Sequence, residues 1–198
     1  MILIYELLKR LNADARKRFI PIIADDGADF LFSVVSQKKP LRILEIGTAI
    51  GYSGILMLTA SPESELLTVE IDRERADEAL ENFREAKLSA RVRLICDDAN
   101  LVINCLTEPF DFIFLDGPKG QYRSMFPTLL GLLKKDGCIF MDDMEYQGWI
   151  DGDDYPEHKH RTIITSLRAL INDLKSAGNL NVSFYRRGEG IAIIEKRG

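Results

Sequence analysis

The sequence predicts an α/β fold: a seven-stranded, mostly parallel sheet with one antiparallel strand at its edge and helices on both faces. Short apolar runs of β type alternate with amphipathic stretches of helical period along the chain. This alternation is typical of βα units whose strands pair in parallel. The turn signal Gly188-Glu189-Gly190 separates the last two apolar runs and predicts a hairpin, which supplies the antiparallel strand.

The individual elements follow from the same patterns. Two helices, over residues 2–12 and 25–37, are expected before the first strand, which follows Pro40. Asp72 is the expected N-cap of a later helix. The sequence predicts strands over 41–46, 66–71, 91–96, 110–115, 137–142, 180–186 and 190–196, further helices over 51–60, 73–87, 98–106, 121–134 and 159–176, and a polar loop over 143–158.

Length and charge limit the class of protein. A chain of 198 residues predicts one domain over 1–198, in which residues 1–38 form an N-terminal helical cap segment. The net charge of −5 argues against a large nucleic-acid interface. No apolar run reaches membrane-spanning length, no signal-peptide pattern opens the chain, and the three cysteines suit a reducing compartment. A cytoplasmic location without a membrane partner is therefore expected.

A glycine-bearing loop follows the first predicted strand. The apolar run Ile43-Leu44-Glu45-Ile46 ends at Gly47, and Gly51 comes four residues later. Such a loop lies at the carboxyl end of a strand, where open α/β sheets bind ligands. Glu70 closes the next strand 23 residues after Gly47, near the spacing at which an acidic residue meets a ribose hydroxyl. Together these features indicate a nucleoside-bearing cofactor.

The loop favours a cofactor without phosphate. It has two glycines instead of the three of a dinucleotide fingerprint, and Glu45 precedes it. A carboxylate there repels a pyrophosphate and attracts a cation, so S-adenosylmethionine, with a ribose and a cationic amino-acid tail, fits best. A nicotinamide reductase fits poorly. The alternative is an ordinary strand-turn-helix corner with no ligand.

Carboxylates recur where the predicted strands end. Asp116, Asp142 and Asp143 are the best candidates to bind a hard divalent ion such as Mg²⁺, which prefers a few carboxylate ligands plus water and substrate oxygens. The alternative is that such residues cap helices and begin turns. Lys119 follows Asp116 by three residues in a tight loop and is a candidate general base; the alternative is a solvated loop lysine.

The motifs together resemble those of the metal-dependent O-methyltransferases of the catechol and caffeoyl-CoA type, which include small bacterial members. The resemblance runs from about Ile20 to the C-terminus. It rests on Glu-Ile-Gly-Thr-Ala-Ile-Gly-Tyr-Ser at 45–53, Val-Glu-Ile-Asp at 69–72, Leu-Asp-x-x-Lys-x-x-Tyr at 115–122, and the Asp142-Asp143 pair. It implies a Rossmann-like fold, S-adenosylmethionine as cofactor, a divalent metal (Mg²⁺, with Ca²⁺ or Mn²⁺ as alternatives) and a homodimer.

The resemblance also implies roles for individual residues. Lys119 and Asp116 match catalytic positions, and Asp116, Asp142 and Asp143 match metal ligands. The cofactor-binding positions are matched by Glu45, Gly47, Ala49, Tyr52, Ser53, Glu70, Asp98, Ala99 and Asp116. Two residues depart from the family pattern: Asp143 stands where Asn is usual, and Pro118 replaces the tryptophan of the catechol enzymes.

The expected activity is methyl transfer from S-adenosylmethionine to a metal-chelated hydroxyl of a small molecule, catechol-like or otherwise bearing vicinal oxygens. One alternative is methylation of a wobble 5-hydroxyuridine in tRNA, which the acidic charge disfavours. Another is a protein that binds S-adenosylmethionine without catalysis. For the dimer, the N-terminal stripe of Ile4, Leu7, Leu8 and Leu11 could contact a second subunit or pack within the same core.

Overall fold

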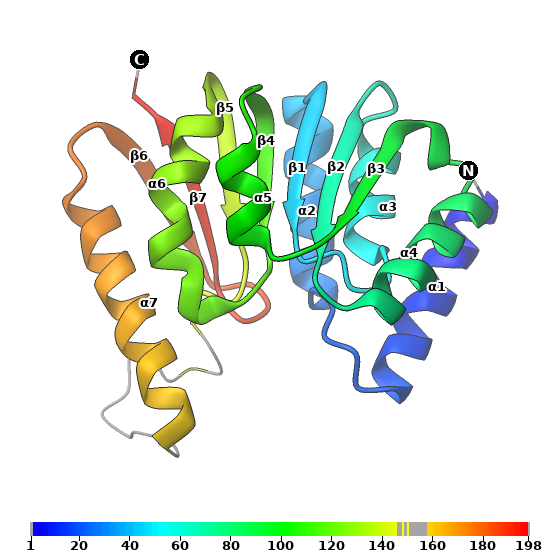
Figure 1. Ribbon diagram of the computed structural model, residues 1–198, viewed down its shortest axis with the longest axis horizontal. Helices are drawn as coiled ribbons and strands as arrows, with labels where there is room; N and C mark the ends of the chain where they lie inside the picture. Colours follow the sequence, from blue (N-terminus) through cyan, green and yellow to red (C-terminus); the bar gives the residue numbers. More distant parts are fainter. Residues whose placement is uncertain (1, 146–147, 149, 151–157, 198) are drawn as a thin grey trace.

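The computed structural model describes residues 2–145, 148, 150 and 158–197, and one mixed β-sheet organises them (Figure 1). The strand order is β3-β2-β1-β4-β5-β7-β6. Neighbours among β1 to β5 pair in parallel, and β7 is antiparallel to both β5 and β6. The predicted fold class is confirmed. The strands are β1 (Arg42–Ile46), β2 (Glu65–Glu70), β3 (Val92–Cys96), β4 (Phe110–Leu115), β5 (Leu133–Met141), β6 (Leu180–Tyr185) and β7 (Ile191–Lys196).

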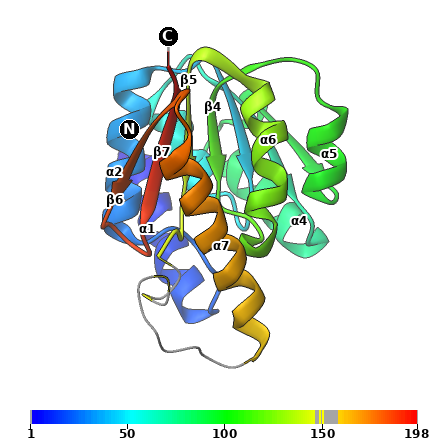
Figure 2. The same cartoon turned by 90° about the vertical axis from the view of Figure 1, so that its left-hand side faces the viewer.

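Helices cover both faces of the sheet. Figure 2 shows α2 on one side and α6 on the other. One apolar core lies between the sheet and α1 to α4, and a second lies between the sheet and α5 to α7. The helices are α1 (Ile2–Lys17), α2 (Asp25–Lys38), α3 (Tyr52–Ala60), α4 (Arg73–Glu85), α5 (Ala99–Cys105), α6 (Tyr122–Leu132) and α7 (His158–Ser176), with short 3-10 turns η1 (Ser89–Arg91) and η2 (Lys119–Gln121).

The N-terminal helix is longer than the sequence predicted, because it continues to Lys17 instead of ending at residue 12. Two residues after its end lies Phe19, whose φ of 54° is incompatible with continuing the helix. On its inner face, Leu7, Leu8 and Leu11 are buried in the core of the same chain. These three residues of the stripe therefore pack within the core of their own chain, and the homodimer stays a prediction.

Two other details of the fold differ from the expectation. The antiparallel strand β7 lies one place inside the edge, because the second strand of the hairpin pairs with both β5 and β6. The strand expected from residue 137 begins at Leu133, which pairs with Phe110; the register then shifts, so that Phe112 pairs with Cys138. Most of the predicted polar loop lies outside the described residues. Among the residues described, no helix is long and apolar enough to cross a bilayer.

The carboxyl ends of the parallel strands meet along one rim. The residues that directly follow β4 and β5 hydrogen-bond to a neighbouring strand: the Asp116 N–H donates to the Ile46 carbonyl at 2.9 Å, and the Asp142 N–H donates to the Leu115 carbonyl at 3.0 Å. The Gly47 N–H donates to the Val69 carbonyl at 3.0 Å in the same manner. The parallel register therefore aligns the first residues of three loops side by side.

Candidate functional site

The loop after β1 approaches the loop after β4 more closely than any side chain would allow. Gly47 has a φ of 96°, and a Cβ built on it would lie 2.3 Å from the carbonyl oxygen of Asp116. Glycine is required here for both its conformation and its lack of volume. The contact places the backbone of the glycine loop directly against the residue that begins the acidic segment after β4.

Glu70 holds the same loop from the other side. Its carboxylate accepts hydrogen bonds from the backbone N–H groups of Ala49 at 2.8 Å and of Ile71 and Asp72 at 3.0 Å each. Ala49 has a φ of 46°, which a non-glycine residue adopts only when its surroundings fix it. The carboxylate predicted to meet a ribose thus also fixes the loop, and its side chain remains on the wall of a pocket.

Glu45 is fully buried and acts within the protein. It accepts hydrogen bonds from the hydroxyls of Ser53 and Thr68, at 2.6 Å each, and Thr68 in turn contacts the hydroxyl of Thr48 at 2.5 Å. Burial raises the pKa of Glu45 to about 7, although the two hydroxyl donors oppose this. The geometry makes Glu45 a support for the start of α3.

Replacing Glu45 with glutamine should stabilise the protein at alkaline pH. A buried carboxyl with a folded pKa near 7 and an ordinary pKa of 4.5 loses stability as pH rises between these values, because the folded state binds the proton more tightly. The difference amounts to about 3 kcal/mol above pH 7. Urea unfolding should therefore show Glu45→Gln close to wild type at pH 4.5 and more stable at pH 8. An equal difference at both pH values would contradict this assignment.

A pocket of about 320 Å³ lies beside these loops. Six of the predicted cofactor-binding residues line it: Gly47, Ala49, Glu70, Asp98, Ala99 and Asp116. The predicted base Lys119 lines it too. Asp98 also caps α5, accepting from the Asn100 N–H at 2.8 Å. Glu45, Tyr52 and Ser53 are not among the lining residues, and the phenol of Tyr52 instead interacts with Asn12 of α1.

Several lining residues were not predicted from the sequence. Pro21 comes from the segment between α1 and α2, Arg75 from the first turn of α4, and Gln121 from η2. Ile71 and Arg75 follow Glu70 closely, so their positions in the sequence were a usable signal. Pro21 reaches the pocket only through the packing of α1, which no local pattern indicates.

The three predicted metal ligands lie near one another, with Lys119 beside them. The Lys119 Nζ lies 3.1 Å from Asp116 Oδ1 and also forms a close ion pair with Asp143 Oδ2. Burial raises the pKa of Asp142, and repulsion by Asp116 and Asp143 raises it further. The pKa of Asp116 is likewise raised by burial, which the attraction of Lys119 only partly offsets. The cluster therefore carries more negative charge than one ammonium balances.

One oxygen of this cluster has no partner. Asp142 Oδ1 is buried and accepts no hydrogen bond within the described part of the chain. A buried carboxylate oxygen without a donor is unfavourable unless a cation or a proton satisfies it. Across the same residues, no three carboxylate, histidine or cysteine side chains converge in metal-binding geometry. The donor chemistry thus suits a hard cation, while two of the carboxylates are already paired with Lys119.

Lys119 is held as an ammonium in this arrangement. Burial alone would lower its pKa, but attraction by Asp116 and Asp143 outweighs burial and holds the pKa above the ordinary value. A lysine in this state is a poor proton acceptor. Tyr122 ties the segment after Lys119 to the end of β4, because its buried hydroxyl donates to the Leu115 carbonyl at 3.1 Å.

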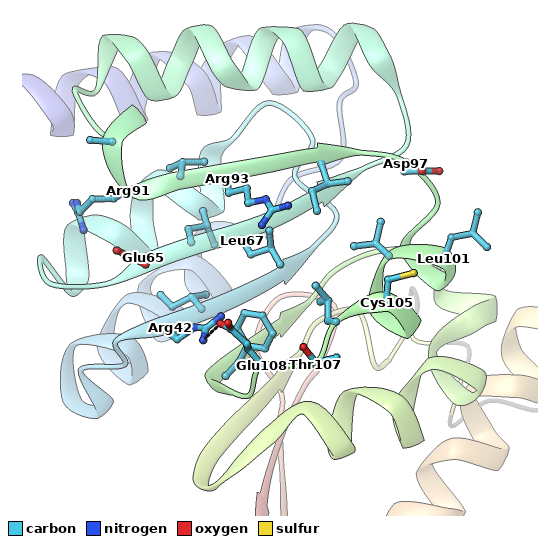
Figure 3. Close-up of a pocket in the computed structure, with 18 residues that line it drawn as sticks. Arg42, Glu65, Leu67, Arg91, Arg93, Asp97, Leu101, Cys105, Thr107 and Glu108 are labelled. Atoms are coloured by element: carbon cyan, nitrogen blue, oxygen red, sulfur yellow. Dashed lines mark ion pairs between the residues drawn. The ribbon is translucent and has the colours of Figure 1, made fainter.

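A larger cavity of about 710 Å³ lies elsewhere, over the β1 to β3 part of the sheet and beside α5 (Figure 3). No predicted site residue lines it. Arg42 at its rim forms an ion pair with Glu108, and Arg91 donates to the carbonyls of Leu58 at 3.1 Å and Ser64 at 2.9 Å. Because most of the predicted cofactor-binding residues line the smaller pocket at the carboxyl rim and not this cavity, the smaller pocket is the better candidate.

The fold and the site together define an α/β protein with a ligand pocket at the carboxyl ends of its parallel strands. The chain belongs to the O-methyltransferase family, whose profile matches residues 3–197. It is 26% identical over 209 residues to the caffeoyl-CoA O-methyltransferase of Populus kitakamiensis, covering 97% of this chain and 87% of the relative. The family resemblance inferred from the motifs is confirmed.

Two further comparisons agree with this assignment. The catechol O-methyltransferase of Niastella koreensis is 35% identical over 131 residues, which are 64% of this chain and 59% of that protein. The solved structure of the O-methyltransferase TomG from Streptomyces achromogenes in complex with SAM superposes with a TM-score of 0.84 at 23% identity, covering 98% of this chain and 90% of TomG. At that identity the structural likeness supports the fold.

Proposed function

We propose that this protein transfers a methyl group from S-adenosylmethionine to a hydroxyl oxygen of a small acceptor with two vicinal oxygens, such as a catechol. The S–CH₃ bond breaks, an O–CH₃ bond forms, the sulfonium becomes a thioether and the hydroxyl proton leaves. Family membership supports the reaction class. The TomG structure contains the same donor.

The observation that carries the proposal is the shared position of Asp116 and Lys119. Both residues line the nucleoside-sized pocket, and Lys119 also contacts Asp143 of the acidic cluster. A donor bound in the pocket would therefore lie next to groups able to orient an acceptor. Holding the acceptor oxygen in line with the methyl carbon and sulfur can supply on the order of 7–11 kcal/mol of the barrier.

Within this proposal, Glu70 would bind the ribose and the backbone of the Gly47–Ala49 loop would face the methionine end. Asp116, Asp142 and Asp143 would hold a divalent cation, and Asp142 Oδ1 is an oxygen ready to ligate it. Such a cation, when bound, lowers the pKa of a chelated hydroxyl. Once separated from its two carboxylate partners, Lys119 would lose its own proton to solvent, and the neutral amine could then receive the hydroxyl proton.

The first test is turnover of caffeate and a panel of catechols with S-adenosylmethionine, followed by mass spectrometry of the methylated products. Activity should fall at least 100-fold in excess EDTA and return with Mg²⁺ or Mn²⁺. Full activity in EDTA would remove the cation from the proposal. Binding of S-adenosylmethionine in calorimetry without turnover of any phenol would instead favour a non-catalytic binding protein.

A further inference from the structure

The Lys119 ammonium is already paired with Asp116 and Asp143, two of the three carboxylates that the proposed cation would need as ligands. Lys119 Nζ is 3.1 Å from Asp116 Oδ1 and in closer contact with Asp143 Oδ2. The three side chains are only 18%, 16% and 25% exposed, so solvent screens their charges weakly. A second, doubly charged cation within the same cluster would experience strong repulsion from an ammonium at this distance.

The ion pairs of Lys119 account for the fact that the three aspartates do not converge as metal ligands. With Nζ between them, Asp116 and Asp143 direct one oxygen each at Lys119, while Asp142 Oδ1 stays unpartnered. No three of the described acidic, histidine or cysteine side chains converge as they stand. Convergence therefore requires that the carboxylates turn, and a turn away from Nζ breaks the two ion pairs.

We propose that Lys119 is an internal counter-ion that competes with the divalent cation, so that an entering cation displaces the ammonium from Asp116 and Asp143. This inference rests on the proposed function for the cation itself. The lysine neutralises the acidic cluster while the cation is absent. After it leaves the two carboxylates and loses its proton to solvent, Lys119 would be a neutral amine available to the acceptor, so the loss of the ion pairs and the assembly of the cation site are one event.

The surroundings give the lysine space to leave. Lys119 lies in the short turn η2 and also lines the 320 Å³ pocket. A rotation about its side-chain bonds moves the ammonium from the cluster toward the pocket without any change in the sheet.

The test is the affinity of cofactor-free protein for Mn²⁺, measured by electron paramagnetic resonance of the free ion. Lys119→Met removes the charge and keeps an apolar stem, and should bind Mn²⁺ at least tenfold more tightly than wild type. Lys119→Arg keeps the charge and should stay within about threefold of wild type. Lys119→Gln replaces the Met variant if that protein does not fold by circular dichroism.

A double-mutant cycle identifies the ion pair responsible. Asp143→Asn leaves Lys119 with Asp116 as its remaining carboxylate partner, so the gain from Lys119→Met should be at least threefold smaller in that background. An undiminished gain would show that Lys119 acts by general repulsion and would overturn the exchange. Equal Mn²⁺ affinities of wild type and Lys119→Met would overturn it while leaving the proposed function intact. Absence of Mn²⁺ binding to every variant would overturn both.

Discussion

Replacing Lys119 with alanine is expected to lower kcat at least 100-fold while the dissociation constant of S-adenosylmethionine changes less than about threefold. Among the described residues, Lys119 is the basic side chain that forms ion pairs with both Asp116 and Asp143. General-base catalysis by such a group typically contributes about 100-fold or more. The pocket would keep Glu70 and the glycine loop, which in the proposed function bind the donor. Product formation by mass spectrometry gives kcat, and calorimetry gives the donor affinity.

The activity of the Lys119→Arg variant distinguishes a general base from a side chain that acts only through its positive charge. A guanidinium pairs well with carboxylates but stays protonated in proteins, so Lys119→Arg should be almost as inactive as Lys119→Ala. Activity of the arginine variant near the wild-type level would assign Lys119 an electrostatic role only. Turnover of the alanine variant within a factor of two of wild type would exclude both roles.

Replacing Gly47 with alanine is expected to destabilise the protein by about 3 kcal/mol or more and to weaken donor binding at least 100-fold. The added Cβ would lie 2.3 Å from the Asp116 carbonyl, and the φ of 96° is one that alanine avoids. Both neighbouring atoms are backbone, so neither loop yields without moving its strand end. Thermal unfolding and calorimetry with S-adenosylmethionine measure the two effects.

Gly131→Ala is the matched control for this experiment. Gly131 lies within α6, and a Cβ built there meets no atom within 4 Å. The alanine variant should be more stable than wild type by roughly 0.5–1 kcal/mol, because alanine favours a helix over glycine. Equal behaviour of the two alanine variants would show that the approach of Gly47 to Asp116 is unimportant.

The order of strands and helices could be predicted because its determinants are local. Alternating apolar runs identify strands, and a carboxylate such as Asp72, which accepts from the Arg75 N–H at 3.1 Å, marks the start of a helix. Parallel pairing then aligns the strand ends, so Glu70 and Asp116 could be placed on one rim from the sequence. The pocket at that rim contains most of the predicted cofactor residues.

The direction and partners of individual side chains were harder to predict. Glu45 precedes the glycine loop by two residues, yet strand alternation and burial turn it toward Ser53 and Thr68 instead of the pocket. Tyr52 lies in the loop motif but faces the first core, against α1. The pairing of Lys119 with Asp143 joins two different loops, and no spacing within either segment specifies it.

Asp116 would belong to both of the proposed sites, for the methyl donor and for the cation, because its backbone touches the glycine loop and its carboxylate faces Lys119. A residue shared in this way makes the occupancies of the two sites interdependent. Thermodynamic linkage then requires reciprocity: whatever factor the methyl donor exerts on affinity for the ion, the ion exerts on affinity for the donor. Selection for a new metal preference would consequently retune donor affinity as well.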